Sequence, residues 1–207
     1  MYLPTRPSGK LALDRQVKLR TRQAINDAER NLMKFNPFRK DTATDPVYAV
    51  YNAIVAQSRQ PRFYADWQVP DTVTGRFDMI SLHMALLFRR LRAESGAGKQ
   101  FSQAVFDLFF QDMDRSLREM GVGDLGVPKK IQKMGSIFFG LLAALNEAMD
   151  RNDQAALQDV LSRNIYEDGT GDHVAALAAY LVSEAEVLAE QSSAAIISGE
   201  LKYEVAA

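Results

Sequence analysis

Apolar residues recur every three or four positions through most of this chain, and this spacing is the feature that most constrains its fold. The segment that opens with Asp45 and Pro46 has apolar residues at Val47, Val50, Tyr51, Ile54 and Val55. This spacing places them on one face of a helix, and Asp followed by Pro is a typical helix start. Strand-like alternation is nearly absent, so the sequence predicts an all-α fold.

The same periodicity predicts further helices, and Pro61 is expected to end the first one. The later helices are expected at Phe77–Leu91, at Gln100–Met120, from Pro128 through Leu145, at Gln154–Ile165, and from Asp172 (its N-cap) toward residue 190. Residues 191–207 are expected to be frayed. We therefore predict one domain, residues 46–207, folded as a bundle of about six or seven helices and preceded by a basic N-terminal arm, residues 1–45.

The N-terminal arm is strongly basic. Residues 1–40 contain ten Lys or Arg and three Asp or Glu, whereas the whole chain has a formal net charge of −1. Residues 1–10 are expected to be disordered, and a weakly amphipathic helix should follow until Asn36 and Pro37 end it. Such a helix can pack on the body of the protein, or it can lie on anionic lipid. The net charge predicts no DNA binding.

Composition excludes several classes of protein. Without cysteine there can be no disulfide, thiolate metal site or Cys nucleophile, and two histidines leave little room for His-based metal chemistry. No apolar run reaches the roughly 18–20 residues that span a bilayer, and the longest, Ile137–Leu145, indicates a buried core helix. We expect a cytoplasmic protein whose contact with the inner face of the cytoplasmic membrane is peripheral.

No set of residues predicts catalysis. Asp107, Asp112 and Asp114 share a predicted helix, but their spacing does not direct all three to one metal ion, so we interpret them as solvent-facing acids. His83 is expected to be a packed or hydrogen-bonded histidine, and His173 a neutral histidine at a helix start. The sequence therefore predicts a protein that is not an enzyme and that has no metal or cofactor.

One glycine-rich turn resembles a known binding motif. The glycines at 121, 123 and 126 match a dinucleotide fingerprint only superficially, because no strand precedes them. Lys129, Lys130 and Lys133 follow that turn and are interpreted as solvated, with contacts to phosphate or lipid as the alternative.

The connector from Arg59 to Asp78 is aromatic and charged, although a simple link between helices would be polar and small. It contains the only Trp, and Trp, Tyr and Arg are the residue types that dominate binding hot spots. Trp67 and Tyr64 can therefore contact a partner, or they can fill the core between two helices. The candidate partner-binding residues are Arg62, Phe63, Tyr64, Trp67, Asp71, Arg76, Phe77, Phe110 and Met113.

Two blocks, Arg59–Asp78 and Phe109–Lys129, resemble the chaperone domain of the ubiquinol–cytochrome c reductase (complex III) assembly factors. The resemblance covers about residues 46–190. The resemblance implies a helical assembly factor. The mitochondrial members of this family chaperone newly made cytochrome b together with a small partner protein, and they associate with the ribosome. Because the chain has no convincing mitochondrial presequence, it resembles a bacterial member of this family.

On this resemblance we expect an assembly factor that binds cytochrome b or a related client in a cleft lined by the candidate residues. The basic arm could add a contact with the ribosome or with an anionic membrane. The alternative interpretation is a helical lipid- or quinone-binding protein at the membrane periphery.

Overall fold

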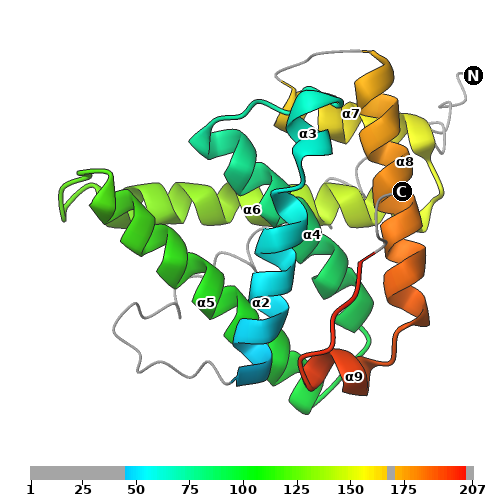
Figure 1. Ribbon diagram of the computed structural model, residues 1–207, viewed down its shortest axis with the longest axis horizontal. Helices are drawn as coiled ribbons and strands as arrows, with labels where there is room; N and C mark the ends of the chain where they lie inside the picture. Colours follow the sequence, from blue (N-terminus) through cyan, green and yellow to red (C-terminus); the bar gives the residue numbers. More distant parts are fainter. Residues whose placement is uncertain (1–44, 167–170, 204–207) are drawn as a thin grey trace, which may run out of the picture.

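The computed structural model describes residues 45–166 and 171–203, and this part of the chain folds into helices without strands (Figure 1). The all-α prediction is therefore confirmed for the described residues, and the basic N-terminal arm lies outside them. The helices are α2 (Asp45–Ser58), α3 (Pro61–Ala65), α4 (Val73–Leu91), α5 (Ala97–Glu119), α6 (Val127–Asp150), α7 (Gln154–Ile165), α8 (Asp172–Glu190) and α9 (Ser193–Ile197).

Helix α4 is the centre of the bundle. Every residue from Phe77 to Leu87 is buried, and the helix contacts α2, α5, α6, α7 and α8. A helix surrounded on all sides must be apolar around its whole circumference, apart from polar groups that find partners. Asp78, Ser81 and His83 are the polar or charged side chains of this buried run, so their surroundings decide what this helix can do.

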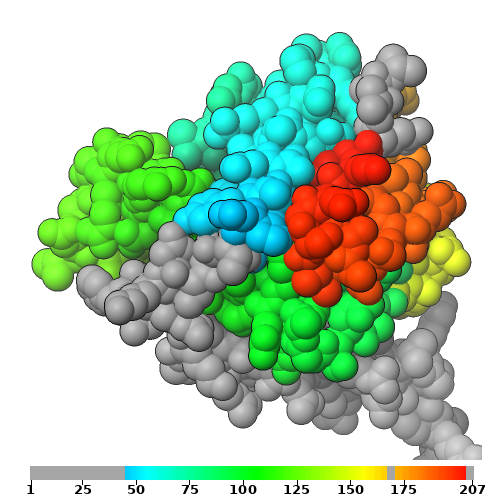
Figure 2. Space-filling view, turned by 60° about the horizontal axis from the view of Figure 1, so that its bottom comes forward, coloured from blue at the N-terminus to red at the C-terminus, as the bar shows by residue number. Residues whose placement is uncertain are grey.

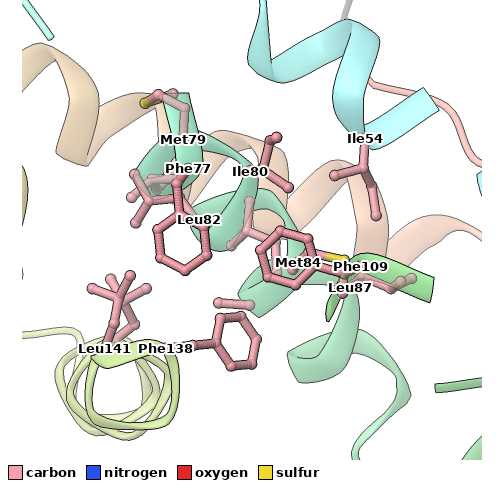
Figure 3. Close-up of a cluster of buried hydrophobic side chains, with 14 of the residues drawn as sticks. Ile54, Phe77, Met79, Ile80, Leu82, Met84, Leu87, Phe109, Phe138 and Leu141 are labelled. Atoms are coloured by element: carbon pink, nitrogen blue, oxygen red, sulfur yellow. The ribbon is translucent and has the colours of Figure 1, made fainter. Parts of the chain in front are cut away.

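Phenylalanines fill the space between α4, α5 and α6 (Figure 3). Phe138 of α6 lies 6.0 Å from Phe109 of α5 between ring centroids, in a tilted arrangement that suits aromatic pairs. The prediction of a buried helix at residues 137–145 holds for one face only. Phe138, Leu141 and Leu145 are buried, but Ile137 is 42% exposed because it points away from α4 and α5.

Polar side chains mark several helix starts. Thr72 Oγ1 accepts a hydrogen bond from the backbone N–H of Gly75 at 3.1 Å, and Asp153 caps α7 in the same way. Helix α2 ends at Ser58, before Pro61 as predicted, and Pro61 also begins α3, as suits a residue without an N–H. Several predicted helix starts were wrong: α4 begins at Val73 instead of Phe77, α5 begins at Ala97 instead of Gln100, and α8 has Gly171 instead of Asp172 at its N-cap.

The prediction of a frayed segment from residue 191 is wrong for residues 191–203. Ser192 caps the short helix α9, whose Ile196 is fully buried. The Gln191 side chain then bonds the backbone of Lys202 twice, donating at 2.7 Å and accepting at 2.9 Å. These bonds return the chain to the bundle, where Tyr203 lies with its ring centroid 5.4 Å from that of His83.

Candidate partner-binding site

The connector between α2 and α4 is a folded element. It forms α3, continues through residues 66–72, and is held back on itself by a hydrogen bond from the backbone N–H of Val69 to the carbonyl of Phe63 at 2.9 Å. A Cβ atom on Gly75 would lie 1.9 Å from the carbonyl oxygen of Pro70. Only glycine lets the connector approach the first turn of α4 this closely.

One side of the connector is an aromatic stack around an arginine. Phe63 is fully buried, and the half-buried Trp67 packs against both it and Tyr180 of α8, with centroid distances of 5.4 Å and 5.5 Å. The guanidinium carbon of Arg62 lies 5.2 Å from the Trp67 ring centroid and 4.9 Å from that of Tyr180. The Arg62 Nε is buried without a hydrogen-bond partner among the described residues, so the ring faces are its main neighbours there.

The other side of the connector carries Tyr64, Asp71 and Arg76. Arg76 Nε donates to Asp71 Oδ1 at 2.7 Å, and both side chains are more than half exposed. This contact lowers the pKa of Asp71. The Arg76 guanidinium also lies 5.9 Å from the Tyr64 ring centroid, and the Tyr64 hydroxyl donates to the carbonyl of Ser58 at 2.7 Å. This side is a charged, solvent-facing surface.

The structure does not bring the nine candidate residues into one cleft. Phe63, Phe77 and Phe110 are core residues with at most 6% exposure, and Phe77 stacks on Phe109 at 5.5 Å between centroids. Met113 is half-buried one turn beyond that cluster. Burial removes the three phenylalanines from any surface that a partner could contact in this conformation. Arg62, Tyr64, Trp67, Asp71 and Arg76 remain at the surface of the connector.

His83 lies at the centre of a buried polar network. Its Nδ1 is 2.7 Å from the carbonyl oxygen of Met79, so Nδ1 must be the protonated nitrogen that donates. Its Nε2 then accepts from the Tyr180 hydroxyl at 2.7 Å, and that hydroxyl accepts from Gln57 Nε2 at 3.0 Å. Burial lowers the pKa of His83 to about 4, which keeps the ring neutral. The prediction of a packed, hydrogen-bonded histidine is confirmed.

Asp78 is the second buried titratable group of α4. It is 7% exposed, and burial raises its pKa to about 7. The pKa shift comes from desolvation alone, because a carboxylate in an apolar setting is costly. With Asp78 protonated and His83 neutral, the buried run of α4 carries no charge at mildly acidic pH.

The sequence predicted that all three aspartates of α5 face solvent, and this prediction is wrong for Asp107. Asp107 is 8% exposed and accepts a hydrogen bond from Gln103 at 2.7 Å. Asp112 accepts from the Tyr51 hydroxyl at 2.9 Å and pairs with Arg115, while Asp114 pairs with Arg118. Within the described residues no group of three or more His, Cys, Asp or Glu side chains is placed to hold a metal ion.

Two residues from other parts of the chain complete the connector and were not predicted from the sequence. Tyr180 contributes its ring to Trp67 and its hydroxyl to His83, and the Tyr166 hydroxyl donates to the carbonyl of Trp67 at 2.9 Å. Both lie about a hundred residues from the connector, where no local pattern connects them to it. The available signal was their residue type: tyrosines on apolar helix faces need a partner for the hydroxyl.

The described residues thus form an all-α bundle whose connector carries an aromatic, arginine-containing surface. A sequence model of the ubiquinol–cytochrome C chaperone family matches residues 65–203, and the chain belongs to this family. No helix among the described residues is both long and apolar enough to cross a membrane.

Two kinds of relative agree with this assignment. The chain is 22% identical over 133 residues to ubiquinol-cytochrome-c reductase complex assembly factor 1 of Xenopus laevis, with 64% of each protein covered. It is 22% identical over 157 residues to the human protein of that name, covering 74% of this chain and 52% of the human one, so less than two thirds of these relatives is matched. The crystal structure of the Cbp3 homolog from Brucella abortus is 38% identical, with a TM-score of 0.71, and 92% of this chain and 96% of that chain are covered.

Proposed function

We propose that this protein is an assembly chaperone that binds cytochrome b or a related subunit during biogenesis of ubiquinol–cytochrome c reductase. The binding site in this proposal is the connector surface, defined as Arg62, Tyr64, Trp67, Asp71 and Arg76. Membership of the family supports the assembly role, and the geometry of the connector supports the site. No catalytic step and no cofactor belong to the proposal.

The observation behind this site is that its aromatic residues are held rigidly while still reaching the surface. Trp67 is half-buried, and its carbonyl is bonded by Tyr166 while its ring rests on Phe63 and Tyr180. Tyr64 is half-buried and tied to the end of α2 through Ser58. Large aromatic side chains fixed before binding lose little conformational entropy when a partner arrives, so they suit a binding surface.

The charges of the connector surface fit a client with both apolar helices and polar loops. The Asp71–Arg76 pair is exposed on both sides, and an exposed pair of this kind contributes little to stability, typically 0 to about 1 kcal/mol. Either member can therefore exchange its partner for a charge on the client at small cost. In this proposal Trp67 covers apolar client surface while Asp71 and Arg76 select the polar neighbour.

The basic segment before Asp45 belongs to the proposal as a second contact, made with the ribosome or with the inner face of the cytoplasmic membrane. Its excess of Lys and Arg gives a salt-sensitive attraction to phosphate groups. The alternative function, a lipid or quinone held inside the bundle, is favoured by no observation, because phenylalanines fill the space between α4, α5 and α6.

A charge swap tests the site without disturbing the fold. The double variant Asp71→Arg with Arg76→Asp keeps an ion pair between exposed positions but reverses both charges, so the melting temperature should stay close to that of the parent protein. We expect a strain that depends on this variant to lose assembled complex III and its cytochrome b signal in difference spectra. A control swap of Glu147 and Arg151, an ion pair at the C-terminal end of α6 whose side chains are 33% and 53% exposed, should retain both signals.

Cross-linking identifies the client directly. A photoreactive residue at Tyr64 or Arg76 should give a cross-link to cytochrome b, and one at the exposed Arg163 of α7 should not. If the connector swap supports normal complex III levels, or if Arg163 cross-links as well as Arg76, the connector surface is not the client site. If no complex III subunit cross-links and complex III is normal without the protein, the assembly role itself is refuted.

A further inference from the structure

The turn between α5 and α6, with the first two turns of α6, forms what we call the hairpin tip, residues 120–133. It projects from the bundle at the left of Figures 1 and 2, away from α7 and α8. Arg118 braces it, since Nε lies 2.6 Å from Asp114 on its own helix and Nη1 lies 2.5 Å from Asp124 in the turn. Gly121 has φ of +81°, which allows the chain to leave α5 sharply. The turn also has its own backbone hydrogen bonds, from the N–H of Val122 to the Leu117 carbonyl at 3.0 Å and from the N–H of Gly126 to the Gly123 carbonyl at 2.7 Å.

The hairpin tip exposes large aliphatic side chains. Leu125 is 91% exposed and Met120 is 51% exposed, whereas Val122 between them packs against the core. Ile137, one turn beyond Lys133 on α6, is 42% exposed. A single exposed Leu is ordinary, but Leu125 is almost completely exposed at the end of a projection, where it lowers solubility and contributes nothing to the core.

The lysines of the hairpin tip are placed against local electrostatics. Lys129, Lys130 and Lys133 are all exposed in the first two turns of α6, where the positive end of the helix dipole disfavours cations. The first turn contains no acidic residue, and the N-cap Gly126 provides no side-chain bond. No carboxylate among the described residues forms an ion pair with any of the three. An arrangement that lowers stability and that no ion pair or cap compensates points to function.

We propose that the hairpin tip docks this protein on an anionic lipid surface. The lysines meet the lipid phosphates while Leu125 and Met120 enter the boundary between headgroups and acyl chains. The hairpin tip contains three basic residues, one acidic residue and no aromatic one. A single-stranded RNA site would use aromatic rings to stack bases, so the aliphatic tip favours a membrane over RNA. This proposal goes beyond client binding and does not depend on it.

Vesicle flotation of the full-length protein tests the proposal. The probes are vesicles of phosphatidylcholine alone and vesicles with phosphatidylglycerol added. Each lysine near an anionic surface is worth about a fivefold change in partitioning, so the triple change of Lys129, Lys130 and Lys133 to Gln should reduce binding on the order of 100-fold. Leu125→Ser should reduce it about tenfold. The control removes as many exposed charges elsewhere, with Lys99, Arg163 and Lys202 changed to Gln.

Binding through the basic N-terminal segment alone would persist equally in all of these variants, so it sets a common floor above which the losses are measured. A second readout localises the contact. Because the chain has no cysteine, an environment-sensitive fluorophore can be attached uniquely at Leu125→Cys or, as a control, at Arg163→Cys. We expect a blue shift with anionic vesicles at position 125 and none at position 163.

Three results would overturn the proposal. The first is no spectral shift at position 125 while the protein floats with the vesicles. The second is equal loss of binding in the control triple variant. The third is loss of binding in the lysine variant with full binding in Leu125→Ser, together with competition by single-stranded RNA, which would make the tip a polyanion site instead.

Discussion

Replacing Asp78 by Asn should stabilise this protein at neutral and alkaline pH and leave it nearly unchanged in acid. Asp78 is 7% exposed on the central helix, and burial raises its pKa from 3.8 to about 7. In the folded protein it is therefore protonated at pH 5, whereas in the unfolded chain it is ionised. Asn has nearly the same shape as a protonated Asp and never acquires a charge.

The sign and size follow from proton linkage. Because folding raises the pKa of Asp78, the folded state binds one more proton than the unfolded state between about pH 4 and 7. The contribution of protonated Asp78 to the free energy of unfolding is therefore complete below about pH 4 and is lost as the pH rises through about 7. The gap between 3.8 and about 7 corresponds to about 4 kcal/mol. The Asn variant avoids this loss, so its advantage should grow from near zero at pH 4 to about 4 kcal/mol at pH 8.

Urea unfolding at a series of pH values measures this difference, with the slope m checked for constancy. His83 titrates in the opposite sense, because burial lowers its pKa to about 4. The contribution of neutral His83 to the free energy of unfolding is lost as the pH falls from 6.5 toward 4. It contributes equally to both proteins, so the difference between them isolates Asp78. An Asn variant that is less stable at pH 8, or a difference that does not change with pH, would refute the reasoning.

Three further changes test the packing of the bundle by thermal or urea unfolding. Tyr180→Phe removes the hydroxyl that donates to His83, and leaving those buried groups unpaired should cost about 1–3 kcal/mol; an unchanged stability would contradict the network. Gly75→Ala places a Cβ 1.9 Å from the Pro70 carbonyl oxygen and should cost about 1–3 kcal/mol, whereas a neutral result would mean that the connector can move aside. Phe138→Ala should cost about 3–5 kcal/mol, whereas Ile137→Ala at the exposed neighbouring position should cost less than about 1 kcal/mol. Equal costs would mean that α6 buries a different face from the one described.

Helix positions were predictable because each depends on neighbours in sequence. Gln154–Ile165 was predicted with the bounds that the structure has, since Asp153 caps it and apolar residues recur along it. The end of the chain was not predictable in this way. Residues 191–203 are short and weakly periodic, and they are held by the Gln191–Lys202 bonds and by Tyr203 against His83, which are contacts between segments.

The candidate site was predictable in composition but not in exposure. The Arg59–Asp78 segment was recognisable as unusual because it is aromatic where a connector is normally polar. Which of its rings face outward depends on the distant helices that cover them. Tyr180 and α8 bury Phe63 completely but leave Trp67 half-buried, and Phe109 buries Phe77. Periodicity within the connector contains no information on those neighbours.

The connector surface is therefore completed by the last long helix. Trp67 needs the Tyr180 ring beside it and the Tyr166 hydroxyl on its carbonyl, and Tyr180 in turn is fixed by His83 on α4. A chain that ended before α8 would lack the Tyr180 ring, which packs against both Trp67 and Phe63. The surface proposed to bind a client can form only after α8 has packed against α4, so folding of the whole bundle precedes binding. This order suits a chaperone, because an incompletely folded copy would present a different surface to the client.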